Sequence, residues 1–166
     1  MIRLPKPSMT GGGGGPIYWS LYNHNHSYYL TKKPNYVIYS IEGDGMSKFK
    51  VDFYKEIDGS KPVGIFIKSL DLKMKAKLVA NLHLLEEYGN LAREPLSKEL
   101  EDGIFELRTI EGNDIVRILY FFDKGRVVIA TNGFVKKKQK TPRSEIELAK
   151  RRRADYLSRK EAGTYE

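Results

Sequence analysis

The sequence predicts an α+β domain in which a helical hairpin and a C-terminal helix pack on a small, mainly antiparallel sheet. Residues 46–166 read in the order strand, helix, helix, three strands and helix. The strand-like runs alternate apolar and polar side chains, whereas the helical runs repeat apolar side chains at three- and four-residue spacing. Three consecutive strands joined by short turns form an antiparallel meander most simply, and helices can then cover that sheet.

The first strand and the helical hairpin occupy residues 49–89. Residues 49–53 alternate Phe, Val and Phe with polar side chains, which is the period of a half-buried strand. Pro62 can begin the first helix, because the first helical position needs no backbone N–H donor. Asp71 is placed to cap the second helix, which we expect to stop near Gly89. A short link between the two helices predicts the hairpin.

The second half of the domain supplies the meander and the last helix. Its strand-like runs lie at residues 104–109, 115–122 and 126–131. The preceding segment, residues 90–102, is polar and contains Pro95, so we interpret it as a connector. Thr141 and Pro142 predict the start of the last helix, with Thr141 as its cap and Pro142 at its first position.

The N-terminal part, residues 1–45, has a different composition. It holds the five consecutive glycines Gly11–Gly15, four of the seven prolines and six of the eleven tyrosines. We expect a flexible or non-native leader rather than a folded subdomain, although residues 36–41 have the pattern of a short strand. Codons for Glu42–Asp44 can contain a bacterial ribosome-binding sequence, so our hypothesis is that Met46 is the natural start. N-terminal sequencing of the naturally expressed protein tests it.

Charge and composition restrict the function. The chain carries 29 Lys or Arg against 21 Asp or Glu, and the stretch from Lys136 to Lys160 alone has 11 basic against three acidic residues. This excess predicts a polyanionic partner that meets the C-terminal part. The chain has no Cys and three His, which excludes disulfides, thiol catalysis and Cys-based zinc sites. We expect no metal, no cofactor, no signal peptide, no membrane partner and a cytoplasmic location.

Several blocks of the domain have a specific pattern. They are Glu106–Arg108, Arg117–Phe121, Gly133–Lys137, Gln139–Pro142, and Glu145 with Ile146 and Ala149. In residues and spacing these blocks resemble the phage-derived HigB branch of the RelE/ParE toxin superfamily, over essentially all of residues 46–166. The resemblance implies a RelE-like fold and the toxin of a type II toxin–antitoxin system. Such toxins are small basic ribonucleases that cut mRNA, usually on the translating ribosome. Each is silenced by a cognate antitoxin, here expected to be HigA-like with a helix-turn-helix domain.

Cleavage of RNA without a metal needs a base near the 2′-hydroxyl, cations around the phosphorane and an acid for the leaving 5′-oxygen. Arg108 and Arg117 lie on neighbouring predicted strands and would form a guanidinium clamp for phosphate if both point to one sheet face. The alternative is two solvated arginines, each neutralised by an acid such as Glu106 or Asp114. The resemblance implies that the arginines of these blocks lie at the catalytic face, so we take both as candidate catalytic residues.

The lysine run after the last strand supplies further candidates. Lys136 and Lys137, nearest the sheet, are candidate catalytic cations. The candidate RNA-binding residues are Phe134, which could stack on a base, and Lys138, Lys140, Arg143 and Arg151. The alternatives are a solvated, sequence-blind lysine surface and a buried phenylalanine at the strand end. We expect the cluster Lys150–Arg153 to attract RNA or the ribosome, or to meet an acidic antitoxin segment.

Asn132 departs from the family pattern, in which His often precedes the Gly-Phe pair. An imidazole can transfer protons near neutral pH, whereas an amide can only orient a hydrogen bond. Catalysis would then depend on Lys, Arg or ribosomal groups, or be weak. The sequence therefore favours a metal-independent endoribonuclease. Two alternatives stay open: a non-catalytic, ParE-like inhibitor that binds DNA gyrase, and an RNA-binding relative that has lost activity.

Overall fold

The computed structural model describes residues 18–23, 26–33, 36–42, 49–136 and 140–165, and the chain divides into two compact units, residues 1–46 and 47–166. The first unit holds three antiparallel strands in the order β1-β2-β3, namely β1 (Tyr18–Asn23), β2 (His26–Lys33) and β3 (Tyr36–Glu42). The strand pattern noted at residues 36–41 falls within β3, and two strands precede it, whereas a flexible leader was expected. That residues 1–45 are a leader stays a prediction.

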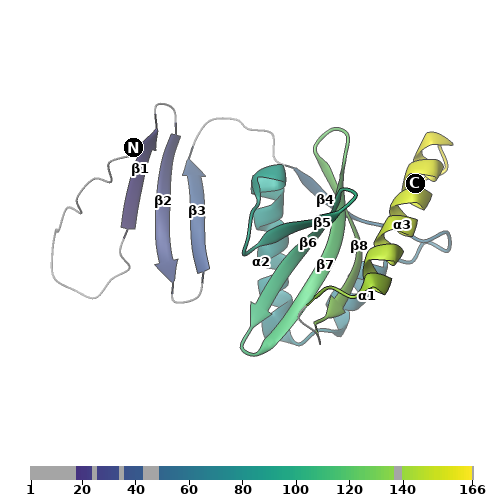
Figure 1. The fold of residues 1–166 in the computed structure, drawn as a ribbon, viewed down its shortest axis with the longest axis horizontal. Helices are drawn as coiled ribbons and strands as arrows, with labels where there is room; N and C mark the ends of the chain where they lie inside the picture. The colour runs from purple at the N-terminus through teal and green to yellow at the C-terminus, as the bar shows by residue number, and fades with distance from the viewer. Residues whose placement is uncertain (1–17, 24–25, 34–35, 43–48, 137–139, 166) are drawn as a thin grey trace. The chain divides into compact units, whose positions relative to one another are not determined.

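The second unit is a five-stranded sheet between helices (Figure 1). Its order is β4-β8-β7-β6-β5, with β4 parallel to β8 and the other neighbours antiparallel. The strands are β4 (Lys50–Phe53), β5 (Ser97–Glu101), β6 (Ile104–Glu111), β7 (Asp114–Asp123) and β8 (Val127–Val135). The helices are α1 (Pro62–Ser69), α2 (Leu72–Tyr88) and α3 (Arg143–Glu161). The predicted α+β fold is confirmed.

Local signals place the helical hairpin as the sequence indicates. Pro62 is the first residue of α1, and Oδ1 of Asp71 accepts hydrogen bonds from the backbone N–H groups of Lys73 at 3.0 Å and Met74 at 3.1 Å. Gly89 follows α2 with a φ of 48°, and a Cβ there would lie 2.1 Å from the ring of Phe49. Only glycine therefore fits where the chain leaves α2 against Phe49, the residue just before β4.

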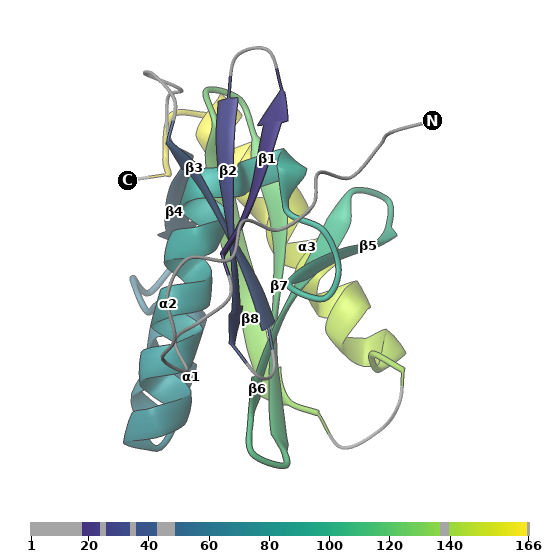
Figure 2. The ribbon, with the colours of Figure 1, turned by 90° about the vertical axis from the view of Figure 1, so that its left-hand side faces the viewer.

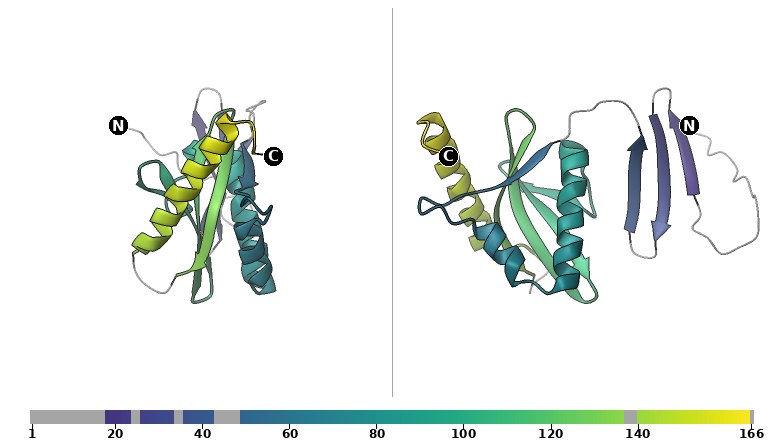
Figure 3. Two further views of the ribbon diagram at one scale, coloured as in Figure 1. Left: turned by 90° about the vertical axis from the view of Figure 1, so that its right-hand side faces the viewer. Right: turned by 180° about the vertical axis from the view of Figure 1, so that it is seen from behind.

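Each face of the sheet carries its own core. Alternation along β7 sends Ile118 and Tyr120 toward α1 and α2, and Leu119 and Phe121 toward α3. Figures 2 and 3 show α2 and α3 on opposite sides of the strands. At Gly133 the sheet approaches α1 so closely that a Cβ would lie 2.4 Å from the ring of Phe66. None of the described helices has both the length and the apolar character needed to span a membrane.

Two details of the prediction are wrong. Residues 90–102, expected as a connector, contain the 3₁₀ turn η1 (Gly89–Leu91) and the edge strand β5. Charged side chains are usual on edge strands, and in β5 they hide the alternation that identifies a strand. The N-cap of α3 is Pro142, and it makes no side-chain capping bond. The hydroxyl of Thr141, expected as the cap, bonds Glu106 instead.

Candidate functional site

A row of three side chains crosses the sheet on the face that α3 covers. Arg108 on β6 is paired with Arg117 on β7, which in turn is paired with Phe134 on β8. Directly paired residues project to the same face of a sheet. The two arginines therefore share one face, as the phosphate-clamp hypothesis requires.

The next row lies toward the open end of the sheet. The backbone N–H of Lys136 donates to the carbonyl of Ile115 at 2.7 Å, which continues the pairing of β7 and β8 past the end of β8. Ile115 is paired with Ile110 on β6. By strand alternation these three residues share the face of the arginine row. Ile110 is 44% exposed, so apolar surface and a lysine border the arginines on the accessible side.

In the opposite direction lies a buried row, formed by Asn132, Leu119 and Glu106. Its members are covered by the first turns of α3, where Ile146 packs in the same core as Leu119. The arginine row therefore stands at the boundary between the covered and the open part of this face.

Glu106 is a buried acid that both arginines share. Its side chain is 1% exposed, its Oε1 lies 3.2 Å from Nη2 of Arg108, and its Oε2 lies 2.9 Å from Nη1 of Arg117. The Thr141 hydroxyl bonds the same Oε2 and accepts a hydrogen bond from Nη1 of Arg117. We call Glu106, Arg108, Arg117 and Thr141 the Glu106 cluster. With two guanidinium groups and one carboxylate it has a formal charge of +1.

The two arginines of the cluster differ in access. The side chain of Arg117 is 4% exposed, and that of Arg108 is 25% exposed. Burial lowers the pKa of Arg117 from its ordinary value, the charge of Glu106 raises it, and the charge of Arg108 lowers it further. Nε of Arg108 is buried and has no hydrogen-bond partner among the described residues. Arg108 is therefore the more accessible of the two arginines, while Arg117 is buried against Glu106.

The other candidates divide by accessibility. Lys136 is half-buried at the end of β8, and Phe134 is half-buried and packs against the core on the α3 side. Lys140 is exposed, whereas Lys137 and Lys138 lie outside the described residues. Arg143 is exposed, but its guanidinium lies 2.6 Å from Glu101 and 2.6 Å from Glu147.

Most residues of the basic cluster on α3 form ion pairs or hydrogen bonds within the domain. This was not expected from the sequence, where the cluster was interpreted as a surface for RNA, the ribosome or an antitoxin. Lys150 lies 2.6 Å from both Glu101 and Asp102, and Nη2 of Arg152 lies 2.6 Å from Glu56. Arg153 donates to the carbonyl of Asp102. These contacts fasten α3 to the rest of the domain. In the cluster Lys150–Arg153, Arg151 is the exposed member.

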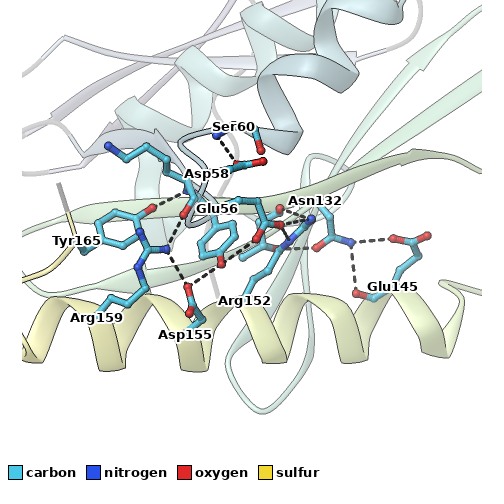
Figure 4. A network of polar contacts seen from close by, with 12 residues as sticks. Glu56, Asp58, Ser60, Asn132, Glu145, Arg152, Asp155, Arg159 and Tyr165 are labelled. Atoms are coloured by element: carbon cyan, nitrogen blue, oxygen red, sulfur yellow. Dashed lines mark hydrogen bonds and ion pairs between the residues drawn. The ribbon is translucent and has the colours of Figure 1, made fainter.

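Asn132 tethers the start of α3 to β8. Its Nδ2 donates to Oε2 of Glu145 at 2.8 Å and to the Glu145 carbonyl at 3.3 Å, and its Oδ1 lies 2.7 Å from Oγ1 of Thr131. Figure 4 shows the side chain directed at the helix. The amide thus orients hydrogen bonds, as its chemistry predicts. It lies one row away from the arginines and on the buried side of them.

The C-terminal half of α3 is held by a second polar network (Figure 4). The Tyr54 hydroxyl donates to Asp155 at 2.7 Å, and with Arg159 it holds the pKa of that carboxyl below its ordinary value. The backbone N–H of Lys55 donates to the Tyr165 hydroxyl at 2.7 Å. Both ends of α3 are therefore fixed, which keeps the boundary beside the arginine row in one place. Among the described residues, no three His, Asp or Glu side chains group as metal ligands.

Comparison with known proteins identifies the family. The family model described as "Phage derived protein Gp49-like (DUF891)" matches residues 65–154, more than half of the chain. The chain belongs to the phage-derived Gp49-like family. Two similar proteins, from Mycobacterium tuberculosis strains CDC 1551 and H37Rv, carry the name "Probable endoribonuclease HigB1". Each is 36% identical over 99 residues, which cover 58% of this chain and 75% of the relative.

These matches confirm the resemblance that the sequence blocks indicated. All four members of the Glu106 cluster lie inside the matched Gp49-like region. From the sequence, we expected Glu106 only as an acid that could neutralise an arginine. Its position two residues before Arg108, on the same face of one strand, was the available signal for its central place.

Proposed function

We propose that this Gp49-like chain is the toxin of a type II toxin–antitoxin pair and acts as a metal-independent endoribonuclease on mRNA at the translating ribosome. The observation that carries the proposal is the similarity to the two HigB1 proteins, which are named as probable endoribonucleases. The accessible cations of the matched region give it a physical basis. They lie where a strand of RNA can reach them beside α3.

The geometry suggests how a phosphate is held. Arg108 presents a partly exposed guanidinium from a cluster with a formal charge of +1, and Lys136 lies one row further toward the open end. Cations fixed before the substrate arrives stabilise the extra negative charge of the phosphorane without reorganising. The lysines after Lys136 add attraction that does not depend on sequence. Ile110 and Phe134 offer apolar surface for a sugar or a base beside the phosphate.

Proton transfer requires a group that can accept a proton from the 2′-hydroxyl and another that can donate one to the 5′-oxygen. Asn132 cannot do either, because an amide only orients hydrogen bonds. In this proposal Lys136 and Lys137 serve the reaction together with groups of the ribosome. The ribosome thus belongs to the proposed site as well as to the proposed target.

The proposed partners follow from this function. They are mRNA, the ribosome and a cognate HigA-like antitoxin with a helix-turn-helix domain, all in the cytoplasm. The alternative is a ParE-like inhibitor that binds DNA gyrase and cuts no RNA. It would leave messages intact and damage DNA, so one expression experiment separates the two.

The test is inducible expression of the full chain in growing bacteria, with message 5′ ends and DNA breaks measured in the same cultures. We expect growth arrest and new 5′ ends inside coding sequences, both reduced at least tenfold by Arg108→Ala. Lys73→Ala is the matched control, because it removes an exposed cation of α2 that belongs neither to the Glu106 cluster nor to the RNA-binding candidates. Arrest with DNA breaks and no new 5′ ends would replace the nuclease with the gyrase inhibitor. If expression causes neither growth arrest nor new 5′ ends, the proposal that the chain is a toxin is refuted.

A further inference from the structure

We propose that Glu106 and Thr141 are positioning residues of the nuclease site, which hold Arg108 and the start of α3 in the arrangement that cleavage needs. This inference rests on the proposed function. It assigns roles to two residues that touch no substrate and that the catalytic candidates do not include. It also makes Arg117 a partner of Glu106 in place of a direct phosphate ligand.

The two ends of the segment between β8 and α3 are each bound to a neighbouring strand. At its start, the backbone N–H of Lys136 is bound to the carbonyl of Ile115 on β7. At its end, the Thr141 hydroxyl is bound to the Glu106 carboxylate on β6. The two anchors lie on neighbouring strands, on either side of the row that contains Arg108. Lys136 and Thr141 are therefore each fixed to a strand beside the proposed phosphate position.

The hydroxyl of Thr141 bonds the Glu106 cluster and does not cap α3. A threonine before a helix is ordinarily a cap, but this hydroxyl makes no capping bond and Pro142 takes the N-cap position. The hydroxyl instead bonds a carboxylate and a guanidinium on the neighbouring strands. The helix forgoes a local bond, and a longer-range contact forms at the site. A purely structural threonine needs no such arrangement.

The charge of Glu106 holds two arginines side by side. Arg108 and Arg117 are directly paired across two strands, where like charges repel. Glu106 allows both to stay there, because each of its oxygens meets one of them, at 3.2 Å and 2.9 Å. One nitrogen of Arg108 is thereby fixed on Glu106, while its Nε has no partner among the described residues. The bond to Glu106 therefore holds the Arg108 guanidinium in place before RNA arrives.

The test of Thr141 measures cleavage of a reporter message by the purified full chain in a reconstituted translation system. Thr141→Val keeps the shape and removes the hydroxyl, Thr141→Ser keeps the hydroxyl, and Ser144→Ala removes an exposed hydroxyl nearby. We expect Thr141→Val to lower kcat at least tenfold with KM within threefold, because the untouched cations still bind the message. Thr141→Ser should restore kcat to within threefold, and Ser144→Ala should match the unmodified chain. Equal kcat for Thr141→Val, or an equal loss for Thr141→Ser, would overturn the inference.

Hydrogen exchange gives the same test without activity. Loss of the anchor should speed amide exchange at least tenfold in peptides that span residues 134–146 of Thr141→Val, with no change in peptides of α2. If the unmodified chain cuts no RNA, the proposed function fails, yet this exchange result still shows whether Thr141 anchors the segment. Unchanged exchange would overturn the anchoring itself.

A double-mutant cycle tests the role of Arg117. Glu106→Gln leaves a buried arginine without its counter-charge, and Glu106→Gln with Arg117→Met removes both. If Arg117 acts through Glu106, the double variant should be at least tenfold more active than the product of the two single losses predicts. Multiplicative losses, with Arg117→Met alone abolishing cleavage, would make Arg117 a direct ligand and overturn this part of the proposal.

Discussion

Replacing Glu106 with Gln should destabilise the domain far more than the loss of a surface ion pair. Glu106 is 1% exposed and lies 2.9 Å from the 4% exposed side chain of Arg117, so Glu106→Gln leaves that guanidinium buried without its counter-charge. Removing one partner of a buried pair costs about 3–5 kcal/mol of unfolding free energy. Gln keeps the shape and one acceptor oxygen, so we expect about 3 kcal/mol, the lower end of that range. Glu106→Gln with Arg117→Met should recover part of this loss, because no buried charge is left alone.

Urea unfolding followed by circular dichroism measures the effect. With a slope of about 1.5–2 kcal/mol per molar urea, the midpoint should fall by about 2 M. Glu111→Gln is the matched control on the same strand: its partner Lys77 lies 3.0 Å away, and the Glu111 side chain is 36% exposed. That surface pair should contribute less than about 1 kcal/mol. If the two substitutions lower the midpoint equally, the reasoning about a buried, shared carboxylate is refuted.

Three further predictions concern other contacts. Asn132→Asp places a carboxylate where the amide now donates to Glu145 at 2.8 Å. Because two carboxylates repel, it should lower the unfolding free energy by about 2–4 kcal/mol at pH 7 and by less at pH 4. Equal losses at the two pH values would contradict this prediction. Burial raises the pKa of Tyr120 to about 12, so the stability that its protonated form gives is complete below about pH 10 and is lost as the pH rises to about 12. Tyr120→Phe should flatten that alkaline loss in urea unfolding, and an unchanged profile would contradict it. Asp71→Ala removes the cap of α2 and should lower the unfolding free energy by about 1 kcal/mol in the same assay. An unchanged unfolding free energy would show that the cap does not stabilise the domain.

Short-range signals predicted most of the fold. Pro62, Asp71 and Gly89 mark the ends of α1 and α2 because a helix terminus is decided by the few residues at it. The alternation of apolar and polar residues gave β7 and its neighbours, since one face of each strand packs on its own helices. β5 was missed because it lies at the edge of the sheet, where burial imposes little pattern on Ser97–Glu101.

The site was less predictable, because it depends on pairings between distant residues. The sequence placed Arg108 and Arg117 on adjacent strands, but only the register shows that they are directly paired. That Thr141 reaches Glu106, 35 residues earlier in the chain, follows from the packing of α3 and leaves no local signal. The same holds for Arg152, which a run of positive charge places on the surface but which is bound to Glu56.

The most direct test of the central claim is cleavage of a ribosome-bound message by the purified full chain, with and without EDTA. On stalled ribosome complexes that are cross-linked beforehand, so that they survive the removal of magnesium, we predict new 5′ ends at the same rate with and without EDTA. We also predict a loss of at least tenfold for Arg108→Met but not for Lys73→Met. Arg108 is the partly exposed arginine of the Glu106 cluster, whereas Lys73 is an exposed cation outside the cluster and outside the RNA-binding candidates. Equal cleavage by both variants, or none by the unmodified chain, would contradict the account.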